Sequence, residues 1–89
     1  MTTENELKAR EYLATFHTHL GAMKYYRHLK KIGINSELLP VPRKFSSDCG
    51  VAVSFTVEGD ISHLISKDIQ KIYLIQGDEG QLLYNNDQD

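Results

Sequence analysis

The hydrophobic pattern changes its period at Thr18, and this change constrains the fold more than any other feature of the sequence. Over residues 11–17 the side chains alternate with a period of two, as in a pleated strand. After Thr18, whose hydroxyl can cap a helix, apolar residues recur every three or four positions, at Ala22, Met23, Tyr26, Leu29 and Ile32. Gly33 can adopt the left-handed conformation that ends a helix. The sequence therefore predicts a strand followed directly by a helix.

The rest of the chain predicts three more strands, a second helix and a C-terminal hairpin. The strands cover 34–39, 51–57 and 72–76, the second helix begins at Asp60 and carries Ile61, Leu64, Ile65 and Ile69, and the hairpin returns through 81–84. The order β-α-β-β-α-β predicts an α+β fold of the ferredoxin-like split β-α-β kind, with an additional C-terminal strand.

In that fold the strand order is four-one-three-two, and two helices cover one face of an antiparallel sheet. The opposite face would carry Leu13, Ala52, Tyr73 and Ile75 and would stay partly apolar. Such a face could pair with a second copy of the chain to form a homodimer.

The length of 89 residues predicts one domain. We expect a polar N-terminal segment over 1–10, a single α+β domain over 11–84 and a flexible tail over 85–89. The first ten residues lack the apolar core of a signal peptide, and no apolar run is long enough to span a membrane. A single cysteine also agrees with a reducing compartment, so we expect a cytoplasmic protein.

The charge is distributed unevenly along the chain. Residues 1–45 hold eight Lys and Arg against four acids, a net charge of +4, and residues 46–89 hold two Lys against eight acids, a net charge of −6. The basic first half could steer the chain toward an acidic partner, or it could simply solvate the helix faces. Because a dense basic patch with interleaved aromatic residues is lacking, nucleic-acid binding is not expected.

Cys49, the sole cysteine, lies in the polar turn Ser46-Ser-Asp-Cys-Gly50. If the first and third strands are antiparallel neighbours, Cys49 comes near residues 17–19 at the start of the first helix, and the preceding loop brings Arg43 and Lys44 to the same edge. These groups would favour a thiolate, and Gly50 leaves one flank of the sulfur open. The alternative is that Cys49 is a small buried hydrophobic residue.

His17 and His19 could join Cys49 as zinc ligands. These residues supply three ligands, and a structural zinc site usually takes four, so we expect no metal. Their other roles would be hydrogen bonding at the helix start or tuning of the thiol. The sequence has no glycine-rich phosphate loop and no hydrolase motif, so we also expect no cofactor. A cysteine–histidine hydrolase is conceivable, but so small a domain offers little cleft for a substrate.

Several stretches resemble a bacterial family of selenium/sulfur carrier-like proteins, formally a domain of unknown function. They are Phe16-His-Thr-His19 leading into Gly21-Ala22-Met23, then Gly33-Ile34, Leu38-Leu-Pro-Val-Pro-Arg43 and Ser46-Ser-Asp-Cys-Gly50. The resemblance covers roughly residues 11–57 with its motifs. The chain departs from the family pattern at Lys44, where an acidic residue is common, and at Tyr26, where a glutamate is common.

The resemblance implies that Cys49 accepts sulfur or selenium as a persulfide and relays it to another protein. The partners would be a cysteine desulfurase-like donor and a thiolating or selenium-utilising acceptor. Arg43 matches the motif arginine and would hold the chalcogen anion or an acidic partner surface. The chain would then be a carrier or accessory protein rather than a stand-alone enzyme. The alternative is a non-catalytic protein-interaction or small-ligand-binding module in which Cys49 is structural.

Overall fold

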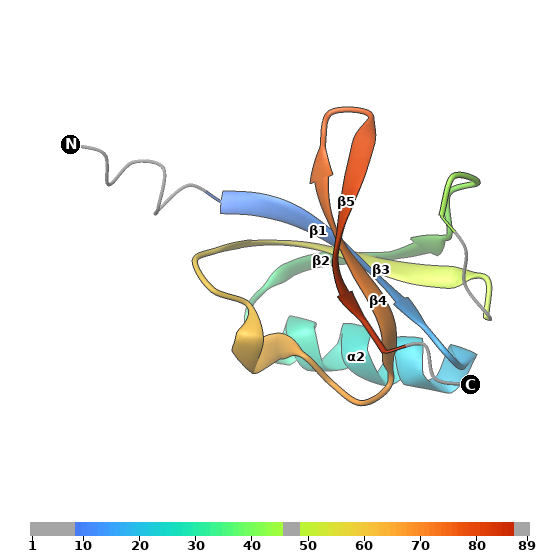
Figure 1. Ribbon diagram of the computed structural model, residues 1–89. Coiled ribbons are helices and arrows are strands. Elements are labelled where there is room, and N and C mark those ends of the chain that lie inside the picture. The colour runs from blue at the N-terminus through green and yellow to red at the C-terminus, as the bar shows by residue number, and fades with distance from the viewer. Residues whose placement is uncertain (1–8, 46–48, 87–89) are drawn as a thin grey trace.

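The computed structural model describes residues 9–45 and 49–86 as one antiparallel sheet with a helix across one face (Figure 1). Its elements are β1 (Ala9–Phe16), α2 (His19–Lys31), β2 (Asn35–Pro40), β3 (Val51–Glu58), the single 3-10 turn η1 (Ser62–Leu64), β4 (Ile69–Gln76) and β5 (Glu79–Asn85). The mixed α+β class is therefore confirmed.

The strands lie in the order β2-β3-β1-β4-β5, and every neighbouring pair is antiparallel. The four strands of the predicted split motif thus lie in the expected order, with β5 added beyond β4. A two-residue turn at Gly77 and Asp78 joins β4 to β5, and Gly77 takes a φ of 63° there. Glycine suits the first central position of a tight hairpin turn for this reason.

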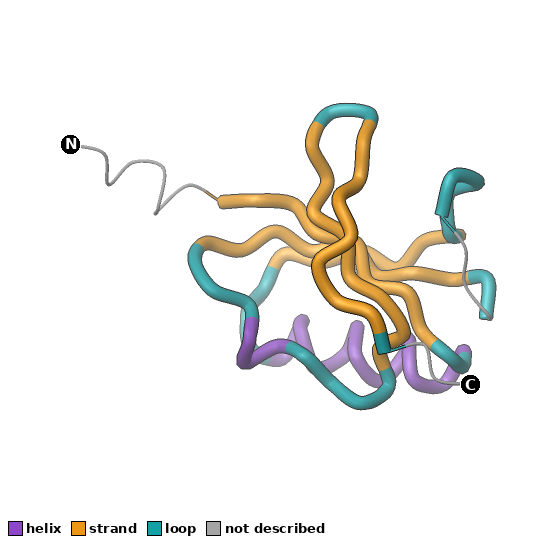
Figure 2. Tube along the Cα trace, viewed as in Figure 1, coloured by secondary structure: helices purple, strands orange, loops and turns teal. Residues whose placement is uncertain are grey.

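The predicted second helix is wrong, so the ferredoxin-like assignment is not confirmed. The crossover between β3 and β4 is mostly loop and contains the turn η1 as its only helical element (Figure 2). The Asp60 carboxylate accepts hydrogen bonds from the backbone N–H and the hydroxyl of Ser62, at 3.2 and 3.0 Å. Such local bonds compete with helix formation. Ile69, predicted to be helical, instead begins β4 opposite Phe16.

The core lies between the sheet and α2. Its centre is an aromatic cluster in which Tyr25 packs 5.3 Å from Phe16 and 5.9 Å from Phe55, measured between ring centroids, and Tyr12 stacks on Phe55 at 5.4 Å. The ring pairs lie at the separations that aromatic packing favours. Leu64, from the crossover, packs into this core where the predicted second helix was expected.

Only part of the predicted inward face of α2 is confirmed: Ala22 and Leu29 are buried, but Met23 is only half-buried. Gly21, Ala22, Tyr25 and Leu29 are buried, whereas Tyr26 is half-buried and Ile32 is 48% exposed. Tyr25 can be buried because its hydroxyl donates a hydrogen bond of 2.9 Å to the Leu64 carbonyl. A tyrosine whose polar end is satisfied packs like other aromatic core residues.

Both predicted ends of α2 are confirmed. The Thr18 hydroxyl accepts a 3.0 Å hydrogen bond from the Gly21 N–H, as an N-cap should. Gly33 follows the C-cap with a φ of 84°, a conformation that costs glycine little.

The face of the sheet opposite α2 is less open than predicted. Leu13 is 3% exposed and Ala52 is 0% exposed, while Tyr73 and Ile75 are half-buried. The chain's own segment 41–45 covers part of this face (Figure 1). Two of the four residues proposed for homodimer contacts are therefore already buried within one copy.

Over the described ranges, α2 is too short and too polar to cross a bilayer, and no other helix there could do so.

Removal of the Tyr25 hydroxyl tests the link between α2 and the crossover. We expect Tyr25→Phe to lower the free energy of unfolding by about 1 kcal/mol at neutral pH, because the Leu64 carbonyl loses its buried donor. Burial also raises the pKa of Tyr25 well above its ordinary value. In the wild type the unfolded phenol therefore ionises above about pH 10 while the folded phenol stays neutral, and stability falls as the pH rises.

The Tyr25→Phe chain has no phenol at this position, so its stability does not change for this reason. The free energy by which the wild type is more stable than Tyr25→Phe should therefore become smaller between pH 7 and pH 11. Urea unfolding at several pH values measures it, with Tyr26→Phe as the matched control on the same helix. A difference that stays constant over this range would contradict the expected role of the buried phenol.

Candidate functional site

Cys49 lies in the connection between β2 and β3, which we call the β2–β3 loop. The ladder between β2 and β3 ends with Pro40 opposite Val51, and one further hydrogen bond of 3.0 Å joins the Val41 N–H to the Gly50 carbonyl. This bond closes the connection at the end of the sheet. Gly50 takes a φ of 78°, which explains a glycine at this position.

Cys49 is half-buried at the margin of the core. Its side chain packs against the buried cluster between the sheet and α2, and its thiol donates a 3.4 Å hydrogen bond to the Val51 carbonyl. An added Cβ at Gly50 would have no atom within 4 Å, so the neighbouring position is open. The thiol is thus held in place by this hydrogen bond, while the residue as a whole stays partly exposed.

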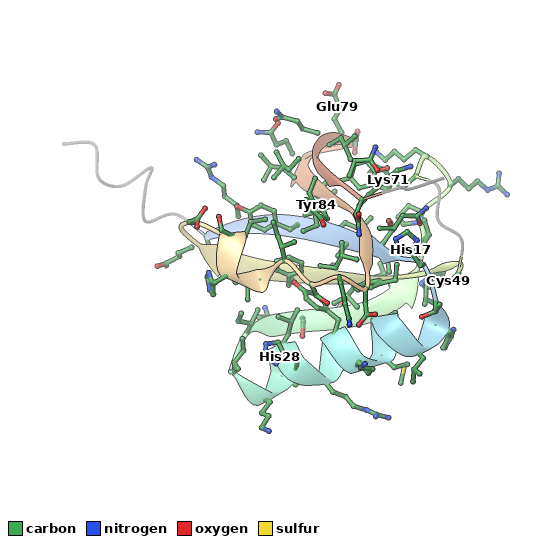
Figure 3. All side chains as sticks on the ribbon, turned by 60° about the horizontal axis from the view of Figure 1, so that its bottom comes forward. His17, His28, Cys49, Lys71, Glu79 and Tyr84 are labelled. Carbon is green, nitrogen blue, oxygen red and sulfur yellow. The ribbon has the colours of Figure 1, made fainter. Side chains whose placement is uncertain are left out.

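The strand register brings Cys49 and His17 to the same end of the molecule. Thr15 pairs with Ala52 in the antiparallel ladder of β1 and β3. Two residues further along the chain from Thr15 is His17, and two residues before Ala52 is Gly50, so the same register places His17 near Gly50. Figure 3 shows His17 and Cys49 at this end, beside the first turn of α2. His17 is half-buried and donates its backbone N–H to the Asp68 carbonyl at 3.4 Å. Thr18 and His19 are exposed at the start of α2.

Asp68 adds a carboxylate to this end, which the sequence analysis missed. A Cβ at Gly21 would lie 3.0 Å from the Asp68 Cβ, so the side chain packs against the first turn of α2. A carboxylate there interacts favourably with the positive end of the helix. Asp68 also lies 4.0 Å from the Lys24 ammonium. The predicted second helix hid this residue, although its place just before β4, which pairs with β1, could have indicated it.

Arg43 and Lys44 lie on the other face of the sheet. They belong to a turn closed by a 3.0 Å hydrogen bond from the Phe45 N–H to the Pro42 carbonyl, and this turn lies opposite α2 (Figure 1). Arg43 is exposed, and the Lys44 ammonium lies 5.8 Å from the centre of the Phe45 ring. In the β2–β3 loop, the turn that contains Arg43 therefore lies on the face opposite α2, whereas Cys49 packs against the core on the α2 side. The intervening Ser46, Ser47 and Asp48 lie outside the described residues.

Phe45 anchors this turn to the sheet. Its ring centre lies 4.3 Å from that of Tyr73, and a Cβ at Gly80 would approach the Phe45 ring to 2.6 Å. Beside this contact lies a pocket of about 200 Å³ with mainly apolar walls, among them Leu13, Leu39, Pro42, Phe45 and Ile75. The sequence alone did not single out Phe45 as a contact of the sheet. A large aromatic side chain within a polar loop was the available signal.

Among residues 9–45 and 49–86, no group of three or more His, Cys, Asp or Glu side chains is arranged to hold a metal ion. The zinc alternative at His17, His19 and Cys49 therefore has no support from geometry.

The fold and the site define a small α+β domain with a single, partly accessible cysteine at one end of its sheet. Comparison with protein families matches residues 11–73, from β1 into β4, to the family described as "Putative Se/S carrier protein-like". The match covers most of the chain, and the chain belongs to this family. No curated protein and no solved structure matches the chain significantly.

The contact between Phe45 and Gly80 provides a test of the loop anchor. Gly80→Ala should displace the Phe45 ring and destabilise the fold by about 1–3 kcal/mol, as overpacking does. Phe45→Ala removes the ring, so the double variant should lose less stability than the two single variants together. Both single variants should also change the rate at which iodoacetamide alkylates Cys49, because Phe45 and Cys49 belong to the same β2–β3 loop. Strictly additive losses in urea unfolding would show that the two residues are not in contact.

Proposed function

We propose that this chain is a sulfur or selenium carrier that holds the chalcogen as a persulfide on Cys49 and relays it to an acceptor protein. The observation that carries the proposal is the position of Cys49, half-buried beside an open glycine at the end of the sheet, in a chain of this family. A carrier needs one thiol that is fixed in position and can be reached by a partner. It needs no second cysteine and no deep pocket.

Loading is a thiol exchange that needs no external oxidant. The Cys49 thiolate attacks the terminal sulfur of a persulfide on the donor protein, and its electron pair forms the new S–S bond. The S–S bond of the donor breaks, and the donor cysteine leaves as a thiolate. For delivery, a nucleophile of the acceptor attacks the terminal sulfur, and Cys49 leaves as a thiolate. Atoms and electrons balance in both steps.

The residues around Cys49 would support these steps in different ways. His17 is the candidate to receive the thiol proton, because the strand register places it at the same end of the molecule as Cys49 (Figure 3). Thr18 and His19 begin α2, and the positive end of a helix favours a nearby anion. Arg43 is exposed in the turn over residues 42–45, which lies on the face of the sheet opposite α2 (Figure 1), so it is the candidate to meet a partner protein.

The apolar pocket beside Phe45 favours a second candidate function. A ligand-binding or protein-interaction module could use this pocket while Cys49 serves only in packing. The volume of about 200 Å³ is small, however, because sites for drug-sized ligands usually span about 300–1,000 Å³. The carrier function is therefore the stronger proposal.

Intact-mass spectrometry tests the carrier proposal directly. Incubation with a cysteine desulfurase and cysteine should add about 32 Da, the mass of one sulfur atom, and dithiothreitol should remove it. Cys49→Ser should abolish the addition while the fold remains, since the substitution replaces one sulfur by oxygen at the margin of the core. Sodium tetrasulfide serves as a donor that needs no docking. If neither the enzymes nor tetrasulfide load the wild-type chain, the proposal fails.

A further inference from the structure

The solvent side of α2 is basic and holds no carboxylate. Leu20, Lys24, Arg27 and Lys31 recur at spacings of three and four residues, so they form one stripe opposite the buried face of the helix. All four are exposed, and no Asp or Glu occurs between His19 and Lys31. We name these four residues the α2 basic face.

The α2 basic face has few neighbouring carboxylates in the part of the chain that the structure describes. Over the described ranges, the carboxylate that lies within 4.0 Å of a lysine or arginine of α2 is that of Asp68, beside Lys24. Clustered cations of this kind create a local positive potential that attracts an oppositely charged partner. Charge complementarity therefore indicates an acidic surface as the partner of this face.

Exposed apolar residues accompany these cations. Leu20 is 67% exposed on the first turn of α2, and Ile32 follows the last turn at 48%. Ile65 is 39% exposed and lines a groove of about 260 Å³ between α2 and the crossover. Lys24, His28 and His63 also line this groove. An exposed apolar side chain among charges is the composition of a protein interface, where a few anchors enter pockets on the partner.

The α2 basic face begins at the end of the molecule that holds Cys49. Leu20 is on the first turn of α2, and Figure 3 shows His17 and Cys49 beside this turn. The helix has 13 residues, so at 1.5 Å per residue the face extends about 20 Å from that end. Transfer of a persulfide requires direct contact between two sulfur atoms. A protein bound along α2 would hold its reactive cysteine within reach of Cys49.

We propose that the α2 basic face is the docking surface for the protein that loads Cys49, and that this protein presents an acidic patch with an apolar pocket for Leu20. The proposal rests on the proposed function and adds the surface and chemistry of the donor. A protein partner is favoured over a nucleic acid because residues 46–89 carry a net charge of −6, with Glu58, Asp60, Asp78 and Glu79 all exposed. An extended polyphosphate chain would meet these carboxylates, whereas an acidic protein patch is local.

Loading kinetics test the docking surface. The probe is a cysteine desulfurase that adds sulfur to the wild-type chain, and the readout is the second-order rate of the 32 Da addition, about one sulfur atom. Arg27→Glu/Lys31→Glu should lower this rate about tenfold or more, and the wild-type rate should fall as the salt concentration rises. Leu20→Ser should lower the rate, but the rate should still fall with salt concentration as it does for the wild type, because the charges are unchanged. Arg10→Glu/Lys67→Glu changes the net charge equally at exposed positions outside α2 and should leave the rate close to that of the wild type.

Two further measurements separate failure of docking from failure of the carrier function. Sodium tetrasulfide should load the wild type and both double variants at equal rates, because it needs no docking surface. The Cys49→Ser chain, which cannot be loaded, should still bind the desulfurase in calorimetry, and Arg27→Glu/Lys31→Glu should weaken that binding. Equal enzymatic loading of the wild type and Arg27→Glu/Lys31→Glu would overturn the docking proposal alone. Binding of bulk transfer RNA at physiological salt that depends on Arg27 and Lys31 would also overturn it, in favour of a nucleic acid.

Discussion

The pairing of β1 with strands on both of its edges determines where everything else in this molecule lies. β1 is bonded to β3 on one side and to β4 on the other, and its residues from Tyr12 to Phe16 are buried. A shift of one residue would turn its core side chains to the other face, so the register is strongly fixed. The same register sets His17 near Gly50 and sets Phe16 opposite Ile69. The candidate site is therefore a direct consequence of two strand ladders.

Much of this arrangement could be predicted because it depends on local patterns. The alternation in 51–57, the cap at Thr18 and the stop at Gly33 each have a mechanism that acts within a few residues. The prediction of a second helix was wrong because the spacing of Ile61, Leu64 and Ile65 suits a helix, while the hydrogen bonds that Ser62 donates to the Asp60 carboxylate favour a turn. Periodicity alone cannot weigh these competing contacts.

The parts of the site that could not be predicted depend on contacts between distant segments. Tyr25, rather than Tyr26, faces the core because the Leu64 carbonyl is there to accept its hydrogen bond. Asp68 reaches the start of α2 only because the crossover returns to β1 at that point. Phe45 is an anchor only because Gly80 leaves room for its ring against Tyr73. The place of Cys49 followed from strand order, but its surroundings required the complete fold.

The hydrogen bond from the Val41 N–H to the Gly50 carbonyl marks the boundary between the sheet and the β2–β3 loop. The ladder of β2 and β3 is already complete at Pro40 and Val51, so the described residues beyond this bond, 42–45 and 49, do not contribute to its register. The entropic cost of closing such a connection grows only slowly with its length. Natural variants could therefore lengthen, shorten or exchange the stretch before the cysteine, and so acquire new recognition sequences while the scaffold is inherited unchanged.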